Sequence, residues 1–262
     1  MFSSNRWLDF FLRNRRAPLP LAIGGVLGGL LILFFLPFLG PQPLPDFSSI
    51  EDIGQRKAAF FSYLEPFIER ANARILRDRE RLDLVIRRLG NGYLGRRNER
   101  WARSMVQSHG LDVDPEEPLS VAILERLRLR MDVIPPSLAL AQAALESGWG
   151  TSRFARQGNN LFGIWCHEPG CGIVPRKRPP GATYEVARYS SPKGCFQAYL
   201  RNLNSNPAYE SLWLLREQSR LQGEPPSGLQ LADGLYRYSQ EQWRYVSKVK
   251  TLIRSNGLQR FD

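Results

Sequence analysis

LALAQAALESGWGTSRFARQGNNLFGIW, residues 138–165, is a run of small and apolar residues that ends in a glutamate and a glycine-rich turn. Pro135 and Pro136 stand just before it, and proline is favoured in the first turn of a helix. Gly148 follows Glu146 closely, and glycine commonly ends a helix. The stretch therefore predicts a short helix that packs through its alanines and leucines, with Glu146 in its last turn.

A carboxylate at the end of such a helix is unusual for two reasons. The C-terminal end of a helix carries partial negative charge, which disfavours a second anion. Apolar neighbours such as Leu145 and Trp149 keep water away from the carboxylate and disfavour its ionised form. Both effects raise the pKa of Glu146, and a carboxylic acid that stays protonated can donate a proton to a leaving oxygen. The alternative is an exposed helix-end glutamate paired with Arg153 or Arg156.

The pattern beyond this stretch is mostly helical. Apolar residues recur at helical spacing from Phe60 to Leu89, and a Gly-Asn-Gly sequence ends that pattern. From Cys166 to Ser191 the chain is rich in Pro, Gly, Lys and Arg, and ATYEVARYSS within it favours one or two short strands. We expect a mainly α protein of the α+β class with a small β lobe. Further helices are expected over 121–129, from the cap Thr151 to Gln157, and over 195–203, 233–236 and 241–253.

The stretch from Leu19 to Gly40 has no charged residue and is long enough for a membrane-spanning helix, which needs about 20 apolar residues. A cleaved signal peptide is the alternative, although its apolar part would be shorter, about 7–15 residues. Arginines precede the span and no Lys or Arg follows it until Arg56. We therefore expect a cytoplasmic N-terminus and a single-pass inner-membrane anchor (1–40), a proline-rich linker (41–50), and a periplasmic domain (51–262).

The chain is strongly basic. Its formal net charge is +11, and the part after residue 40 carries 32 basic and 24 acidic residues, a charge of +8. This excess suits an anionic partner. Because nucleic acid is not expected outside the cytoplasm, the polymers of the cell envelope are the expected partner.

Three cysteines suit an oxidising compartment. Cys166 and Cys171 are spaced to close a small loop, which leaves Cys195 free or able to exchange. A metal site is the other interpretation of CHEPGC, because His167 sits beside Cys166. Zinc sites usually show four well-spaced ligands, so we expect no metal here.

The segment ALESGWGTSRFARQGNNLFGIW is similar to the helix-and-loop motif of the β-N-acetylglucosaminidases that cut peptidoglycan, and most similar to the Bax-like branch of Gram-negative envelope proteins. The similarity is strong over residues 130–255, and the helical extension 51–129 also resembles that branch. Membership implies a lysozyme-like fold, in which a helical lobe and a small β lobe flank a groove. It maps the catalytic acid onto Glu146 and implies no metal or organic cofactor.

The same resemblance suggests further site residues. Tyr238 resembles a tyrosine placed near the acid, whereas Tyr245 and Ile253 look like helix packing. The NNLFG segment matches the segment that forms the floor of the groove in the family. The alternative is a structural role, in which its glycine and asparagines make a turn and its phenylalanine fills the core. Aromatic side chains suit the flat apolar faces of sugars, yet each is equally suited to a core. The substrate-binding candidates are Trp149, Asn160, Phe162, Trp165, Tyr184 and Tyr189.

Glu185, within ATYEV, matches the second carboxylate of the family, and two carboxylates are usual in glycoside hydrolysis. The region is shorter than in flagellar-type members and lacks their EY-x-NG run. The alternative is an exposed strand charge that faces Arg188. Asp233 is a weaker candidate for the second carboxylate.

The resemblance thus implies a glycoside hydrolase that cuts the bond between N-acetylglucosamine and N-acetylmuramic acid in peptidoglycan glycan strands. A muramidase or a lytic transglycosylase, which needs one acidic residue, is an alternative with the same fold. A wall-binding protein without activity is the other alternative, and the presence of Glu146 argues against it.

Overall fold

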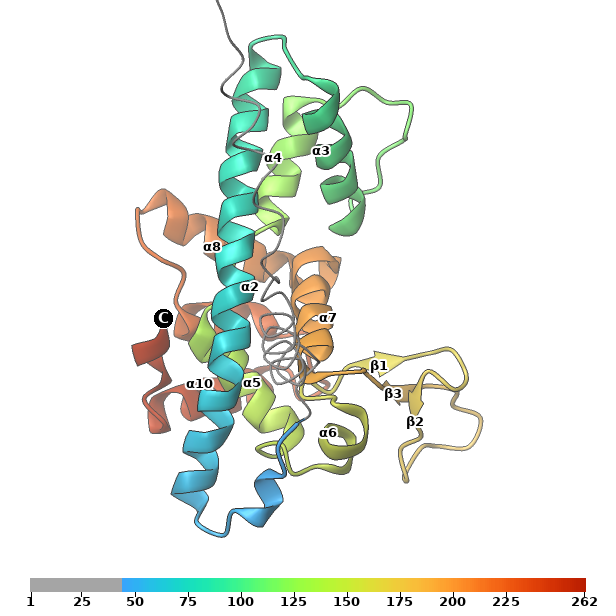
Figure 1. Ribbon diagram of the computed structural model, residues 1–262, viewed down its shortest axis with the longest axis vertical. Coiled ribbons are helices and arrows are strands. Elements are labelled where there is room, and N and C mark those ends of the chain that lie inside the picture. The colour runs from blue at the N-terminus through green and yellow to red at the C-terminus, as the bar shows by residue number, and fades with distance from the viewer. Residues whose placement is uncertain (1–43) are drawn as a thin grey trace, which may run out of the picture. The chain divides into compact units, whose positions relative to one another are not determined.

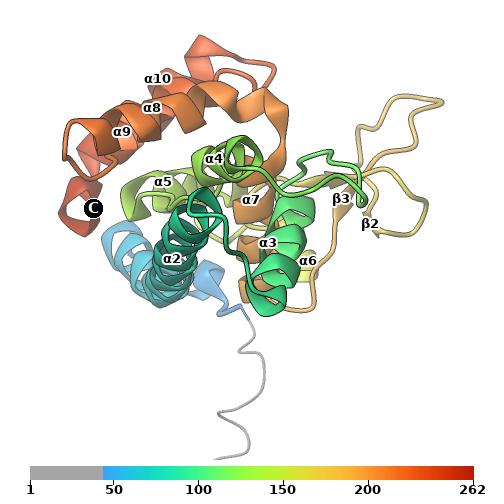
Figure 2. The same ribbon diagram turned by 90° about the horizontal axis from the view of Figure 1, so that it is seen from above.

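The computed structural model describes residues 44–262, which form a helical assembly with one small antiparallel sheet (Figures 1 and 2). The predicted mainly α, α+β class is confirmed. The proposed cytoplasmic tail, the membrane anchor and the start of the linker lie outside the described residues. Among residues 44–262, no helix combines the length and the apolar character that crossing a membrane requires.

Helix α5 (Pro136–Ser147) lies in the core of the molecule. Most of its side chains are buried, including the polar Ser137 and Gln142, so the helix is enclosed on nearly all sides. Gly148 ends it with a left-handed conformation, φ 56°. The side chain of Asp262 accepts hydrogen bonds from the Ser137 amide (2.9 Å) and hydroxyl (2.7 Å). This carboxylate satisfies free donors of the first turn and complements the positive end of the helix.

Helix α2 (Ile53–Gly90) is the longest element and contributes to two apolar cores. Its first half, through Phe60 and Leu64, joins the larger core around α5. Its second half, through Leu82 and Val85, joins a smaller core with α3 (Arg96–Ser108) and α4 (Val121–Arg130). The predicted helix 60–89 and its Gly-Asn-Gly end are confirmed, as is the helix at 121–129. Helix α3 was not predicted from its polar sequence.

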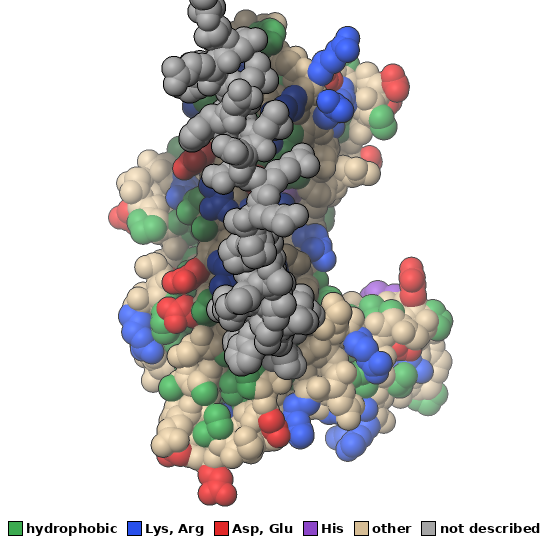
Figure 3. Space-filling view, in the orientation of Figure 1, with side chains coloured by type: hydrophobic (Ala, Val, Ile, Leu, Met, Phe, Trp, Pro, Cys, Tyr) green, Lys and Arg blue, Asp and Glu red, His purple; other side chains and the backbone are tan. Residues whose placement is uncertain are grey.

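Arginines gather at the end of the molecule where α2 meets α3 (Figure 3). Arg81, Arg88, Arg96 and Arg97 line one surface pocket there. None of the four has an ion-pair partner among residues 44–262. This end of the domain therefore carries part of the positive charge noted in the sequence.

The β lobe consists of three very short strands in the order β1-β3-β2. They are β1 (Trp165–Cys166), β2 (Gly172–Ile173) and β3 (Glu185–Ala187), and Cys166 lies opposite Glu185. The preceding helix α6 spans Arg153–Gly158. The predicted cap Thr151 was wrong: the Ser152 hydroxyl accepts the Ala155 amide, and Thr151 donates back to the Gly148 carbonyl.

The C-terminal part surrounds α5 with short helices. The helices predicted at 195–203 and 241–253 are confirmed, the segment 233–236 forms a 3-10 helix, and α8 was not predicted. The elements are α7 (Pro192–Ser205), η3 (Pro207–Tyr209), α8 (Glu210–Leu221), α9 (Gly228–Leu231), η4 (Ala232–Leu235), α10 (Trp243–Ser255) and η5 (Leu258–Phe261), and a 3-10 turn, η2 (Phe47–Ser49), precedes α2.

A buried ionic network joins the two cores. Asp132, between α4 and α5, pairs with Arg220 of α8 (2.9 Å) and with Arg79 of α2 (3.5 Å). Arg216 of α8 is 1% exposed and donates to the carbonyls of Arg130 (2.9 Å) and Asp132 (3.0 Å). These charges are compensated by partners from three separate segments, so the network fixes how the segments pack.

Candidate active site

Glu146 lies in the last turn of α5 and opens onto a groove of about 1000 Å³. The other walls come from the NNLFG turn, the start of β1, α7 and the segment that joins η4 to α10. The residues that line the groove are Glu146, Phe162, Gly163, Ile164, Trp165, Asn202, Tyr209, Tyr236, Arg237, Tyr238, Ser239, Gln240, Glu241 and Gln242. The sequence prediction that the acid faces a groove between helices and β lobe agrees with this geometry.

The turn after α6 approaches the acid very closely at Gly163. This residue has φ 63°, and a Cβ added to it would lie 2.7 Å from Glu146 Oε2. Any side chain here would therefore need both a left-handed backbone and space that the carboxylate occupies. Glycine lets the backbone form the wall of the groove directly beside the acid.

The half-buried carboxyl of Glu146 has a raised pKa. Burial is the main cause, because it removes water from the ionised form. The nearby negative charge of Glu241 also raises the pKa, whereas a hydrogen bond from Tyr245 and the charge of Lys248 lower it. Burial outweighs the two opposing effects, so the site favours the protonated acid, as a proton donor requires.

A chain of buried side chains supports the acid from below. The Tyr199 hydroxyl donates to Gln142 Oε1 (2.7 Å), and Gln142 Nε2 donates to the Tyr245 hydroxyl oxygen (3.0 Å). The Tyr245 oxygen thus accepts one bond, and its own proton is available for the hydrogen bond to Glu146. The expectation that Tyr245 only packs was incomplete: its ring is buried in α10, but its hydroxyl meets the acid.

Tyr238 lies at the groove, but its hydroxyl already has a partner. It donates to the Phe162 carbonyl (2.7 Å), and its ring stacks on Tyr245 at 5.3 Å. Tyr238 therefore fixes the turn that carries Gly163 and aligns the tyrosine that binds the acid. This geometry gives the predicted catalytic tyrosine a positioning role.

Asn160 and Phe162, both predicted substrate ligands, belong to the turn beside the acid; Phe162 lines the groove and Asn160 does not. Asn160 is 2% exposed, and its amide nitrogen donates to the carbonyls of Ile164 and Ala187, each at 2.8 Å. The Phe162 ring is buried and stacks on Tyr199 at 4.0 Å. Asn159 adopts φ 51° as the cap of α6. The side chains of this motif thus build the wall behind Gly163.

Of the predicted sugar-stacking aromatics, the structure brings one to the groove. Trp165 is 51% exposed, lines the groove and stacks on Tyr184 at 4.4 Å and 15°, so Tyr184 supports it from behind. Trp149 and Tyr189 lie away from the groove lining. Trp149 packs on Phe61 of α2 (5.3 Å), and Tyr189 packs against the main core, so neither ring lines the groove.

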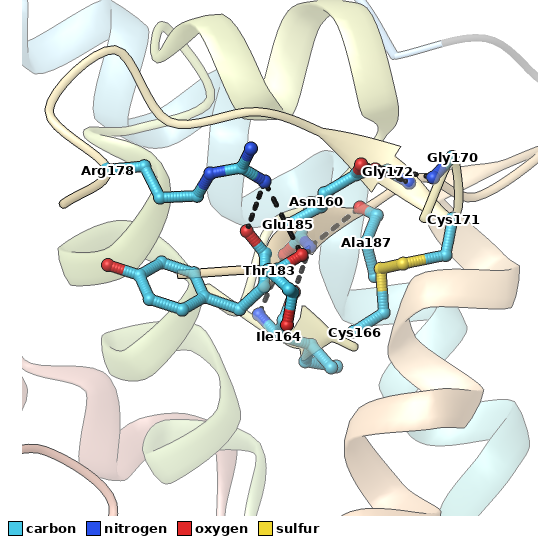
Figure 4. Close-up of a disulfide and its surroundings, with 11 residues drawn as sticks. Asn160, Ile164, Cys166, Gly170, Cys171, Gly172, Arg178, Thr183, Glu185 and Ala187 are labelled. Atoms are coloured by element: carbon cyan, nitrogen blue, oxygen red, sulfur yellow. Dashed lines mark hydrogen bonds between the residues drawn. A yellow bond between two sulfur atoms is a disulfide. The ribbon is translucent and has the colours of Figure 1, made fainter. Parts of the chain in front are cut away.

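Glu185 faces the β-lobe loop instead of the groove (Figure 4). Its carboxylate accepts the amides of Gly170 (3.0 Å) and Gly172 (2.7 Å), and these bonds hold the pKa of Glu185 below its usual value. The alternative of an exposed charge facing Arg188 is wrong in its exposure, because Glu185 is 6% exposed, although the charge of Arg188 does help to lower the pKa of Glu185. The predicted second catalytic carboxylate is therefore engaged elsewhere in this structure.

The loop that Glu185 holds is also closed by a disulfide. Cys166 and Cys171 are joined, with their Cα atoms 6.2 Å apart (Figure 4). Both sulfurs of the alternative metal site are thus committed to a covalent bond. Cys195 is a buried free thiol whose sulfur accepts the Leu161 amide (3.4 Å), and burial raises its pKa to about 12.

Glu241 is a groove carboxylate that the sequence reasoning missed. It lies on the segment before α10, and its Oε2 accepts a 2.6 Å hydrogen bond from Lys248, which keeps its pKa below the usual value. Asp233, the weaker candidate, is instead paired with Lys250 at 2.7 Å in a neighbouring pocket.

The chain is similar to known proteins over the residues that form this site. The glucosaminidase family, described as mannosyl-glycoprotein endo-β-N-acetylglucosaminidase, matches residues 122–258. Protein bax of Escherichia coli (strain K12) is 31% identical over 215 residues, which are 81% of this chain and 74% of that protein. The peptidoglycan hydrolase FlgJ of Vibrio parahaemolyticus is 38% identical over 89 residues, 30% of this chain and 29% of that protein.

A solved structure shows a weaker likeness. The catalytic domain of the autolysin Auto from Listeria monocytogenes matches with a TM-score of 0.42 and 16% identity, covering 94% of this chain and 100% of that one. The family match includes Glu146, Gly163, Tyr238 and Tyr245. The resemblance predicted from the sequence is thereby confirmed, and the chain belongs to the glucosaminidase family.

Proposed function

We propose that this protein hydrolyses the glycan strands of peptidoglycan, at the bond between N-acetylglucosamine and N-acetylmuramic acid, with Glu146 as the general acid. The observation that carries the proposal is the position of Glu146: a partly buried carboxyl with a raised pKa that lines a groove in a member of the glucosaminidase family. The similarity to a protein named as a peptidoglycan hydrolase supports the choice of substrate. We also propose that the helical lobe and the β lobe flank the groove in a lysozyme-like arrangement.

In the first step, Glu146 gives its proton to the glycosidic oxygen while the bond from that oxygen to the sugar C1 breaks. The bonding electrons leave with the oxygen, and positive charge develops at C1. Tyr245 stabilises the carboxylate that forms, because it can donate a hydrogen bond to the ionised oxygen. Gly163 leaves space for the leaving oxygen beside the acid.

In the second step, water adds to C1 and gives up a proton. Glu241 is the other carboxylate that lines the groove within the described residues, and its bond to Lys248 keeps it ionised and able to accept that proton. Attack by the acetamido group of the substrate is the route that needs no second carboxylate. NMR of the newly released anomer separates them, since direct attack by water inverts the configuration at C1 and acetamido participation retains it.

Replacing Glu146 with Gln tests the proposal directly. An amide nearly matches the carboxyl in volume but cannot donate the proton, so hydrolysis should fall by roughly 10²–10⁴-fold while the fold is kept. Mass analysis and reducing-end analysis of digested peptidoglycan identify the bond that is cut and expose a muramidase or transglycosylase product. Glu224→Gln, at an exposed position outside the groove, is the control and should digest at the wild-type rate. Near wild-type digestion by Glu146→Gln would refute the assignment.

We further propose that residues 19–40 anchor the chain in the inner membrane, with the domain from residue 41 onward in the periplasm. The uncharged stretch and the arginines before it support this orientation. The Cys166–Cys171 disulfide fits an oxidising compartment. A C-terminal fusion to a reporter that works only in the cytoplasm should give no signal, and strong reporter activity would contradict the proposal.

A further inference from the structure

A second pocket adjoins the groove on the side of α8 and α10. It has a volume of about 420 Å³, and its walls are mainly apolar and include Leu214, Leu215, Gln218, Asp233, Tyr236 and Trp243. Tyr236 lines both this pocket and the groove that contains Glu146. The second pocket, here called the Trp243 pocket, is therefore a neighbour of the groove and shares its Tyr236 wall.

The Trp243 pocket exposes large apolar side chains to solvent. Trp243 is 60% exposed and Leu214 is 55% exposed, and the Trp243 ring rests against Tyr236 with 4.9 Å between ring centroids. Contact with Tyr236 limits the freedom of the indole, so a ligand would meet a ring already held in place. Ligand sites commonly combine such an apolar surface with a few polar groups.

Backbone strain lies at the junction of the groove and the Trp243 pocket. Gln242, which lines the groove and directly precedes Trp243, has φ 51° and ψ −121°. A non-glycine residue in such a conformation typically costs about 1–3 kcal/mol and is retained where the surroundings hold it, often at functional sites. The strained residue joins the wall of the groove to the first residue of α10, which presents the indole.

The chemistry of the pocket fits one N-acetylated sugar ring. The flat face of a pyranose is apolar and suits an aromatic ring, and the methyl of an acetamido group suits Leu214 and Leu215. The Asp233 carboxylate is fixed by Lys250 at 2.7 Å and still offers lone pairs to sugar hydroxyls. Gln218 adds a donor and an acceptor on the same pocket wall.

We propose that the Trp243 pocket is a further subsite that holds an N-acetylated sugar of the same glycan strand, beyond the sugars next to Glu146. This inference rests on the proposed function, because it takes the glycan strand as the ligand of the groove. Trp165 provides an exposed aromatic platform from β1, and it lines the same groove as Tyr236, against which the Trp243 ring rests. The two platforms would let the protein contact a long strand at two separate places.

The test compares the binding of short and long glycan fragments. The probes are peptidoglycan glycan fragments of two and of eight sugars, titrated by calorimetry into the full chain carrying Glu146→Gln, so that they are not hydrolysed. Adding Trp243→Ala should weaken binding of the long fragment by about tenfold, equivalent to roughly 1.4 kcal/mol, and leave binding of the short fragment within about twofold. Trp243→Phe should restore most of the affinity, because a ring remains for stacking.

Two further variants serve as controls for this comparison. Leu221→Ala removes another exposed apolar side chain, at the end of α8, and should leave both affinities unchanged. If Trp243→Ala fails to fold, Leu214→Gln changes the opposite wall of the pocket and should give the same length-dependent loss. Equal binding of the long fragment with and without the indole would overturn the subsite, as would an equal loss for both lengths.

Failure of the proposed function has a different signature. In that case the wild-type chain would not cut peptidoglycan, whatever residue stands at position 243. If the wild-type chain cuts peptidoglycan and Trp243→Ala binds the long fragment normally, the catalytic proposal stands and the subsite alone is refuted. If the Trp243 pocket instead binds a second protein, Trp243→Ala should leave the affinities for both glycan lengths unchanged.

Discussion

At the scale of single residues, the acidity of Glu146 depends on a hydroxyl that only the tertiary structure brings to it. Tyr245 reaches the acid from α10, and Gln142 of α5 sets the direction of its proton. The hydrogen bond favours the ionised carboxylate, while burial favours the protonated one. The balance of these two effects sets the pKa of Glu146, and therefore the pH above which it loses its proton.

Tyr245→Phe should move the pH profile of hydrolysis. Activity needs protonated Glu146, so it falls as the pH rises through the raised pKa of this group. Without the tyrosine hydroxyl the ionised form loses a hydrogen bond, the pKa rises further, and the falling limb of kcat against pH should shift to higher pH. Tyr93→Phe is the control, because this exposed tyrosine lies outside the groove, and it should leave the limb in place. A limb that does not move in Tyr245→Phe would show that this hydroxyl does not act on Glu146.

Gly163→Ala should inactivate the protein by at least about tenfold. The added methyl would meet the acid at 2.7 Å, and a left-handed alanine costs roughly 1–2 kcal/mol. Gly181→Ala is the matched control, because Gly181 has φ 80° but no atom within 4 Å of the added Cβ. Thermal melts and digestion rates should show similar destabilisation in both variants and lost activity in Gly163→Ala alone. Full activity in Gly163→Ala would mean that the turn can move away from the acid.

The sequence was sufficient for the acid and its helix but not for the groups around it. Glu146 could be placed because its helix signals and its apolar neighbours are local. Tyr245 could not, because its apolar spacing in α10 is that of an ordinary core residue, and only packing of α10 on α5 reveals the hydroxyl. The sequence also could not show that Asn160 and Trp149 lie outside the groove lining, because a motif does not say whether a side chain points toward the groove or toward the backbone behind it.

At the scale of elements, the register of the β lobe decides what Glu185 does. Pairing of Cys166 with Glu185 directs the carboxylate to the loop amides of Gly170 and Gly172. A shift of one residue would reverse every side chain of so short a strand. Sequence reasoning could not fix this register, since three strands of two or three residues carry too little alternation. Helix α3 was missed for a related reason: only Ala102 and Val106 are buried, and two residues are too few to show an apolar spacing typical of a helix.

Glu185→Gln should affect the lobe more than the chemistry. The glutamine nitrogen cannot accept an amide proton, so one glycine amide loses its partner. We expect hydrolysis to fall less than about tenfold, well below the roughly 10²–10⁴-fold loss for Glu146→Gln, together with faster amide exchange in the loop. Cys166→Ser with Cys171→Ser should give a similar loosening. Complete inactivation by Glu185→Gln with normal loop exchange would instead make Glu185 the second catalytic carboxylate.

At the scale of the whole molecule, stability depends on the ionic network that joins the two cores. Burial alone would raise the pKa of Asp132, but the hydrogen bond from Arg220 and the charges of Arg79 and Arg216 outweigh it and keep the pKa below its usual value. A lowered carboxyl pKa stabilises the fold at pH values above the usual carboxyl pKa. That stabilisation is lost as the pH falls through the lowered pKa.

Asp132→Asn should therefore reduce the free energy of unfolding at neutral pH by about 3–5 kcal/mol, because the buried Arg79 and Arg216 and the partly exposed Arg220 lose their anion. The difference from the wild type should shrink as the pH falls. Asp83→Asn is the control: its carboxylate pairs with Arg128 at 3.1 Å, but both side chains are at least one third exposed, and the expected change is below about 1 kcal/mol. Urea unfolding at several pH values measures both. Equal stability of Asp132→Asn and Asp83→Asn would contradict the assigned importance of the network.

The cap on α5 also has a consequence for when the protein becomes active during its synthesis. Asp262 satisfies the first turn of the helix that ends at Glu146, yet it stands 125 residues after Ser137 in the chain. A ribosome makes these residues in order, so the helix with the acid emerges long before the carboxylate that completes it. Tyr245, which bonds to the acid, is also made late. The nascent chain thus carries Glu146 before it has either the Tyr245 hydrogen bond or the Asp262 cap, so the order of translation delays completion of the site until residue 262 has been made.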